Sequence, residues 1–286
     1  MIRRQRKRLS ARADARATGK KGIPVPNDAF VNGPAYERYM ERWSRPAAAE
    51  FLRRLRPLIG ARWLDVGCGT GVLTRAALEL AGPGAVVGLD RSEALIAYAR
   101  EHVDDPRARF QTGDASDLGF DTGAFDLVVS GLVLNFLPEP LRAVREMARV
   151  TRFGGTVAGY VWDYAGRMDL VRCFWDAAVA LDPAAETLDE GRRFPLRDAQ
   201  ALTDLFAAAG LRDIEAWPIQ VRTVFLDFDE FWSPFLGGVG PAPAYAMSLD
   251  ERSRTRLRDR IRASLPIGED GLIRLMASAW AVSGRR

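Results

Sequence analysis

The stretch Trp63-Leu64-Asp65-Val66-Gly67-Cys68-Gly69-Thr70-Gly71 decides how the rest of the chain is organised. An apolar run that ends in an acidic residue and then breaks into alternate glycines predicts a buried strand that turns sharply into a helix. Glycine suits this turn because it adopts positive φ without strain, and because its missing side chain lets a ligand lie against backbone N–H groups at the helix N-terminus. The loop therefore predicts a ligand-binding site.

The glycine spacing separates two classes of nucleotide-type ligand. A dinucleotide-binding loop follows the pattern G-x-G-x-x-G, which would place its third glycine at position 72, where this chain has Val72. Here the pattern is G-x-G-x-G and ends at Gly71. The spacing weakens the alternative of an NAD-dependent dehydrogenase but leaves it open.

The segment from Asp65 to Gly71 resembles motif I of the class I S-adenosylmethionine-dependent methyltransferases, of the small-molecule, ubiquinone/menaquinone-methyltransferase-like type. Four later segments agree with that family in order and spacing: Val87-Gly88-Leu89-Asp90, Thr112-Gly113-Asp114-Ala115, Phe125-Asp126-Leu127-Val128-Val129-Ser130 and Gly154-Gly155-Thr156-Val157. The matched segments span roughly residues 60–163. The resemblance implies methyl transfer (EC 2.1.1.-) with S-adenosyl-L-methionine as the cofactor.

Strand-like and helix-like segments alternate along the chain. Strands are expected at 61–66, 85–90, 108–112, 125–130, 156–162, 211–224 and 271–282, and helices at 46–58, 72–81, 93–102, 139–150 and 197–209. Alternation of this kind implies parallel strands with helices on both faces and ligands at the carboxyl edge of the sheet. The fold class is therefore α/β: a doubly wound, Rossmann-like sheet of seven strands, mostly parallel, with an antiparallel last strand.

Three acidic residues at predicted strand ends carry the cofactor hypothesis. Asp90 lies 19 residues after Gly71, where a carboxylate can accept both hydroxyls of a ribose. Asp65 is expected to reach the ammonium of the methionine part, directly or through water. In the resembled family the position of Asp114 contacts adenine, with a structural Asx turn as the alternative. The cofactor-binding candidates are Tyr36, Asp65, Gly67, Cys68, Gly69, Thr70, Gly71, Asp90, Arg91, Asp114, Ala115 and Ser130.

Tyr36 belongs to a segment with an aromatic face. Tyr36, Tyr39, Met40 and Trp43 recur at helical spacing. In the methyltransferases that this chain resembles, an N-terminal helix with a tyrosine near this point often closes over the cofactor. Simple packing of the stripe on the domain is the alternative.

Two insertions, at about 163–196 and 227–266, are rich in aromatic residues and predict a helical cap over the sheet edge. Clefts for drug-sized ligands are lined in this way, which favours an apolar or flat acceptor, although ordinary core packing is the alternative. The substrate-binding candidates are Asn135, Trp162, Tyr164, Trp232 and Phe235. If the nucleophile is a hydroxyl that must lose its proton, Asp163 or Tyr160 at the end of the fifth strand is best placed to act as the catalytic base.

Charge is divided unevenly along the 286 residues. Residues 1–21 hold nine Lys or Arg against Asp14, a net charge of +8, so the remainder carries −4 because the whole chain carries +4. We expect residues 1–22 to be a basic, disordered tail and residues 23–286 to form one methyltransferase domain with its core at about 60–163. An RNA-associated methyltransferase, or a non-catalytic cofactor-binding regulator that uses the tail, remains an alternative.

Several absences restrict function further. No lysine follows Lys21, so the lysine-containing tetrad of ribose-methylating RNA enzymes cannot form, which argues against nucleic acid as the acceptor. A small-molecule methyl acceptor is therefore the expected partner. No residue cluster has metal-ligand spacing, and no run reaches the ~18 apolar residues of a membrane span. Two cysteines cannot build a disulfide framework, which favours the cytoplasm. The oligomeric state is left undetermined.

Overall fold

The computed structural model describes residues 40, 42–238 and 240–286. The predictions for residues 1–22 and for Tyr36 lie outside the described residues. The strands are β1 (Arg62–Val66), β2 (Ala85–Asp90), β3 (Ala108–Thr112), β4 (Phe125–Gly131), β5 (Thr151–Trp162), β6 (Arg212–Phe225) and β7 (Ile273–Arg285). The α-helices are α2 (Arg42–Leu55), α3 (Val72–Leu80), α4 (Glu93–His102), α5 (Pro140–Val150), α6 (Asp169–Leu181), α7 (Glu190–Arg193), α8 (Ala199–Ala208), α9 (Phe228–Trp232), α10 (Pro241–Ser248) and α11 (Glu251–Ser264).

The seven strands form one sheet in the order β3-β2-β1-β4-β5-β7-β6. Strands β1 to β5 pair in parallel, and β7 runs antiparallel to both β5 and β6. The strand order reverses at β1, so the crevice between the carboxyl ends of β1 and β4 is the expected ligand site of such a sheet. The predicted α/β fold with an antiparallel last strand is confirmed.

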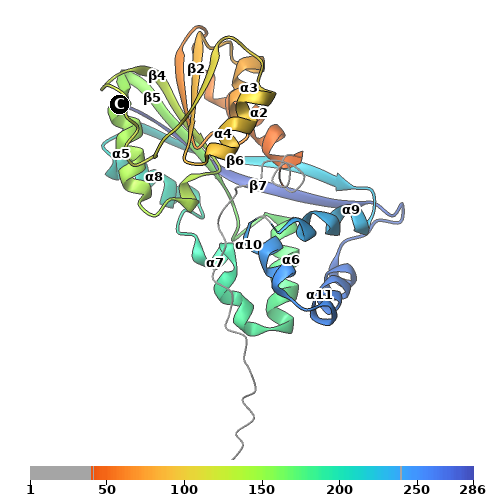
Figure 1. The fold of residues 1–286 in the computed structure, drawn as a ribbon. Helices are drawn as coiled ribbons and strands as arrows, with labels where there is room; N and C mark the ends of the chain where they lie inside the picture. Colours follow the sequence, from red (N-terminus) through yellow and green to blue (C-terminus); the bar gives the residue numbers. More distant parts are fainter. Residues whose placement is uncertain (1–39, 41, 239) are drawn as a thin grey trace, which may run out of the picture.

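Helices cover both faces of the sheet (Figure 1). Neighbouring strand residues point to opposite faces: Trp63 joins the apolar cluster under α2, α3 and α4, whereas Leu64 joins the cluster under α5 and α8. Both side chains are almost fully buried. The central strands β1 and β4 are therefore mostly apolar because both of their faces are covered, whereas the edge strand β3 keeps only Phe110 buried.

Two elements start earlier than their sequence patterns predict. Helix α2 begins at Arg42, with Pro46 inside it, because Trp43 is buried against Phe225 of β6 at 5.9 Å between ring centroids. Strand β5 begins at Thr151 because its pairing with β4 continues past a bulge, with Phe125 opposite Thr151 and Leu127 opposite Thr156. In both cases long-range packing extends the element beyond its local signal.

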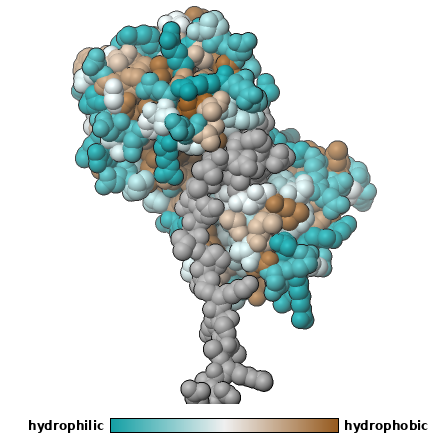
Figure 2. Space-filling model, viewed as in Figure 1, coloured by the Kyte–Doolittle hydropathy of each residue, from teal (hydrophilic) through white to brown (hydrophobic). Residues whose placement is uncertain are grey.

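The two insertions form a second lobe at the far end of β6 and β7 (Figure 1). The first contributes α6, the 3-10 helix Pro183–Leu188 and α7; the second contributes α9, the 3-10 helix Ser233–Gly237, α10 and α11. This lobe has an aromatic interior in which the Phe174 and Phe235 rings stack at 4.7 Å. Hydrophilic side chains cover most of the face shown in Figure 2, with apolar ones between them.

Candidate active site

A cavity of about 270 Å³ opens at the carboxyl ends of β1, β2 and β4. Its walls come from the loop after β1, the ends of β2 and β5, the loops after β3 and β4, and residues of α2, α7 and α10. Nine of the twelve cofactor-binding candidates line it: Asp65, Gly67, Cys68, Gly69, Thr70, Asp90, Arg91, Asp114 and Ala115. The sheet topology thus gathers residues that are up to 50 positions apart in the sequence.

The glycine loop uses its three glycines in different ways. All three adopt positive φ, at +74° for Gly67, +53° for Gly69 and +84° for Gly71. A Cβ on Gly69 would have no neighbour within 4 Å, so this residue faces open space in the cavity wall. A Cβ on Gly71 would lie 3.0 Å from Val103, so Gly71 instead lets α3 approach the end of α4. Gly71 does not line the cavity.

Asp65 is the buried acid at the floor of the cavity. Thr74 Oγ1 donates to its Oδ2 at 2.7 Å, while Oδ1 is buried without a hydrogen-bond partner among the described residues. Burial, together with the nearby carboxylate of Asp90, raises the pKa of Asp65 to about 7. Thr70 Oγ1 is likewise buried and unpartnered. Buried polar atoms need a hydrogen-bond partner, and a polar ligand in the cavity would supply one to each of these two atoms.

Asp90 holds the glycine loop and the end of β2 together. Its Oδ2 accepts from Gly69 N at 3.0 Å, and its Oδ1 accepts from Ser92 N at 2.8 Å. A carboxylate oxygen has a second lone pair, so both oxygens can still accept from the two hydroxyls of a ribose. Burial raises the pKa of Asp90 from its ordinary value.

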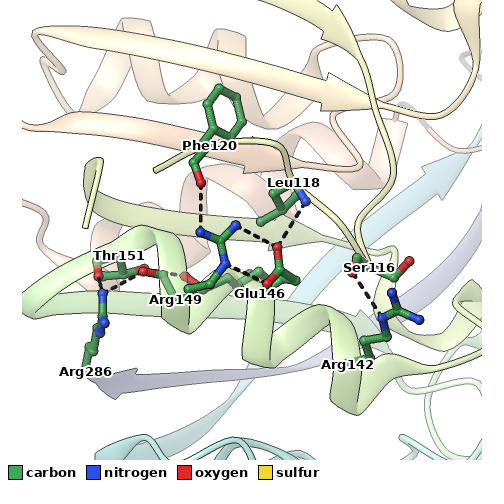
Figure 3. Close-up of polar contacts among 9 residues, drawn as sticks. Ser116, Leu118, Phe120, Arg142, Glu146, Arg149, Thr151 and Arg286 are labelled. Carbon is green, nitrogen blue, oxygen red and sulfur yellow. Dashed lines mark hydrogen bonds and ion pairs between the residues drawn. The ribbon is translucent and has the colours of Figure 1, made fainter. Parts of the chain in front are cut away.

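The loop after β3 is fixed from below by α5 (Figure 3). Arg142 Nε donates to Ser116 O at 3.2 Å, Glu146 accepts from Leu118 N at 3.2 Å, and Arg149 donates to Phe120 O at 2.8 Å. Asp114 is the exposed acid at the start of this loop. Its Oδ1 accepts from both the backbone N and the Oγ of Ser116 at 2.7 Å, so the Asx turn is present, and Ser116 holds the pKa of Asp114 below its ordinary value.

Several predicted residues lie outside the cavity lining, because backbone groups or core packing engage their side chains. Ser130 Oγ donates to Val66 O at 2.9 Å. The amide of Asn135 pairs with both backbone groups of Leu196, at 3.0 and 3.1 Å. Asp163 accepts from Gly166 N and Arg167 N and so closes the turn after β5. Trp232 and Phe235 pack in the aromatic interior of the second lobe.

The cavity has an aromatic end, formed by residues at the carboxyl end of β5 and just after it. Tyr160 and Trp162 from β5 and Tyr164 just after it all line the cavity, and none is more than 7% exposed. Glu190, the first residue of α7, lies in the same wall and was not predicted. Glu190 follows Asp189 at the start of a helix, where acidic residues are common because they stabilise the helix N-terminus. The local sequence therefore does not distinguish a cavity-lining glutamate from an ordinary one at this position. Met40, which lies two residues before α2, and Ser44 of α2 also line the cavity.

The residues present fit S-adenosylmethionine. Gly69, where a Cβ would meet no atom within 4 Å, offers room for close backbone approach. Asp65 has an unused buried acceptor for an ammonium, and Asp90 has acceptors for a ribose. Burial keeps the pKa of Cys68 well above its ordinary value, so the loop cysteine is a neutral thiol. Within the described ranges there is no cluster of three His, Cys, Asp or Glu side chains that could hold a metal ion.

Comparison with known proteins agrees with this site. Residues 64–159 match the family described as methyltransferase domain. The chain is 30% identical over 185 residues to demethylmenaquinone methyltransferase of Geobacillus stearothermophilus, covering 59% of this chain and 78% of the relative. It is also 30% identical over 188 residues to trans-aconitate 2-methyltransferase of Variovorax paradoxus (strain S110), covering 65% of this chain and 70% of that relative.

Solved structures show the same fold at low sequence identity. Phosphoethanolamine N-methyltransferase 2 of Haemonchus contortus, in complex with S-adenosyl-L-methionine, superposes with a TM-score of 0.55 at 19% identity, over 88% of this chain and 56% of that chain. YcgJ of Bacillus subtilis superposes with a TM-score of 0.54 at 17% identity, over 84% of this chain and 97% of that chain.

The fold and the site define a Rossmann-like group-transfer enzyme with a nucleoside-containing cofactor. With the relatives above, the chain belongs to the class I S-adenosylmethionine-dependent methyltransferases, and S-adenosyl-L-methionine is its cofactor. This outcome decides against the dehydrogenase alternative. Among the helices that the structure describes, none is both long and apolar enough to cross a membrane.

Proposed function

We propose that this methyltransferase methylates a small organic acceptor that binds at the aromatic end of the cavity. The observation that carries the proposal is the continuity of one cavity from the glycine loop to Tyr160, Trp162 and Tyr164. An acceptor among these rings would share a single space with the cofactor. The names of the two relatives, which specify menaquinone and aconitate chemistry, support an acceptor of this size.

The proposed roles of the residues follow from their positions. The cofactor, when bound, supplies a methyl group already activated on a sulfonium. Asp65, Asp90 and Asp114 hold the cofactor, while Tyr160, Trp162 and Tyr164 exclude water and orient the acceptor. Orientation alone can lower the barrier by ~7–11 kcal/mol. Under this proposal the first insertion, residues 163–196, serves as the acceptor cap of a single domain.

Two measurements on the purified protein test this proposal. Calorimetry with S-adenosylhomocysteine first establishes cofactor binding. A cell extract that contains metabolites, RNA, DNA and protein is then incubated with methyl-labelled S-adenosylmethionine, and label is followed into each of these fractions. We expect label in small molecules only; label confined to RNA, DNA or protein would overturn the proposal.

A variant pair tests the location of the acceptor. Tyr164→Ala should lower transfer at least tenfold while S-adenosylhomocysteine affinity stays within twofold, because Tyr164 lies at the aromatic end. Tyr98→Ala is the matched control, since Tyr98 stacks on His102 of α4 and does not line the cavity. Equal transfer by both variants would remove the aromatic end as the acceptor site.

A further inference from the structure

Glu190 is the carboxylate on the acceptor side of the cavity. Among the residues that the structure describes, five acidic ones line the cavity: Asp65, Asp90, Asp114, Glu139 and Glu190. The first three belong to the predicted cofactor side, and Glu139 is exposed. Glu190 is only 2% exposed and reaches the cavity from the first insertion, which also carries Tyr164.

The surrounding structure fixes Glu190 firmly. Trp175 Nε1 of α6 donates to its Oε2, and its own backbone N–H also bonds the carboxylate. A Cβ on the next residue, Gly191, would lie 2.7 Å from Tyr164 O, so the backbone of α7 rests directly on the turn that follows β5. The Glu190 carboxylate is therefore held beside the aromatic end.

Glu190 forms no ion pair with any of the described residues. Arg172 of α6 is committed elsewhere, bonding Asp189 Oδ2 at 2.6 Å and Tyr164 O at 3.1 Å. Asp189 raises the pKa of Glu190 and Arg193 lowers it, but both effects are smaller than that of burial, which brings the pKa to about 7. Within the described part of the chain, the other ionisable groups at this end of the cavity are the phenols of Tyr160 and Tyr164.

A buried carboxylate without a counter-ion is costly and marks a functional site. Trp175 could be satisfied at lower cost by a backbone carbonyl, so hydrogen bonding to the indole alone does not require a charged partner. Because Glu190 lies in the wall of the proposed acceptor space, its carboxylate can act on a bound acceptor.

We propose that Glu190 is a catalytic residue that takes the proton from the nucleophilic oxygen or nitrogen of the acceptor. This inference rests on the proposed function and narrows the acceptor class to hydroxyl or amine compounds with an apolar body. The acceptor heteroatom gives an electron pair to the methyl carbon, and the C–S bond breaks with its pair remaining on sulfur. The O–H or N–H proton passes to the Glu190 carboxylate and then to solvent.

A ligand pair tests the position of the carboxylate without the unknown acceptor. Sinefungin carries an ammonium where S-adenosylmethionine carries its methylsulfonium, whereas S-adenosylhomocysteine has a neutral thioether there. We expect Glu190→Gln to weaken sinefungin binding about tenfold by calorimetry and to leave S-adenosylhomocysteine binding within twofold. In the native protein, the affinity ratio of sinefungin to S-adenosylhomocysteine should rise between pH 6 and 8, and this rise should vanish in Glu190→Gln. The ratio cancels the titration of Asp65, which affects both ligands.

Glu186→Gln is the matched control, because Glu186 lies in the same insertion but pairs with Arg192 at the surface. An unchanged affinity ratio in a folded Glu190→Gln protein would overturn the inference. Failure of both ligands to bind the native protein would instead overturn the proposed function. Label transfer into the extract supplies a second readout: its rate should rise with pH through about 7 in the native protein, and Glu190→Gln should lower it at least 100-fold. A Glu190→Gln protein with a native rate and pH profile would exclude proton transfer to Glu190.

Discussion

The backbone N–H of Gly69 donates to Asp90 Oδ2 at 3.0 Å, which joins the glycine loop after β1 to the end of β2. The two residues are 21 positions apart. Parallel pairing places Val66 opposite Leu89, so both loops leave the sheet side by side. Asp90 therefore shapes the loop, and under the proposed function its remaining lone pairs accept from the ribose of the cofactor.

Asp90→Asn should weaken S-adenosylhomocysteine binding by roughly 10–100-fold. The amide provides one acceptor oxygen in place of two, and a hydrogen bond to a charged group is worth about 1.5–3 kcal/mol. Calorimetry at pH 7.5 measures the change. Asp104→Asn, at an exposed position outside the cavity, is the control and should leave the affinity unaltered; equal affinities in the two variants would contradict the assigned role of Asp90.

Gly69→Ala and Gly60→Ala form a matched pair. Both glycines have positive φ, +53° and +77°, and a Cβ at either would meet no atom within 4 Å. Each substitution should therefore cost a similar ~1–2 kcal/mol of stability. Because only Gly69 lines the cavity, only Gly69→Ala should lose cofactor affinity, by at least tenfold. Thermal unfolding and calorimetry on both variants check this, and a loss of affinity in Gly60→Ala would argue for a general effect of strain.

Cofactor binding should release protons near pH 6. The pKa of Asp65 is raised to about 7, and an ammonium beside it favours the ionised form. Calorimetry in two buffers with different ionisation enthalpies measures the proton number. Asp65→Asn should abolish the release from this site and weaken binding at least tenfold.

The same shift of Asp65 affects the stability of the ligand-free protein. A carboxyl group with a raised folded-state pKa binds more protons when folded, so its contribution to stability falls as pH rises from about 4 to about 7. The pKa of Glu190 is also raised to about 7, so its contribution to stability falls over the same pH range. Between pH 5 and pH 7.5 the free energy of unfolding, measured with urea, should therefore fall less in Asp65→Asn than in the native protein. An equal fall in the two proteins would mean that Asp65 ionises freely.

Trp232→Ala should lower stability by about 3–5 kcal/mol, as expected for removing a buried tryptophan, and should leave cofactor affinity unchanged. Its ring packs on Phe228 and Phe235 inside the second lobe, with centroids at 6.5 and 5.7 Å. Thermal unfolding provides the measurement. Leu226→Ala, at a side chain 71% exposed, is the control and should shift the unfolding temperature little. A Trp232→Ala protein of native stability would show that this packing contributes little.

The local sequence was enough to locate the sheet and its cofactor loops. Strand β2, α4 and β3 begin and end where their patterns predict, because each combines a clear apolar period with a turn or cap, such as Ser92 at the start of α4. The acids at the ends of β1 and β2 could be assigned for the same reason. Position along a strand fixes which sheet edge a residue occupies.

The acceptor side was decided by tertiary structure. Asp163 and Asn135 had suitable positions and chemistry, but their side chains bond backbone groups that only the folded chain brings near. Glu190 is 30 residues from Tyr160 and shares a wall with it only because the first insertion folds back onto β5. Periodicity reports which face of its own element a residue occupies, whereas the partners of a side chain depend on segments distant in sequence. The sequence by itself therefore determined the fold and the cofactor, and long-range packing decided which polar groups line the rest of the cavity.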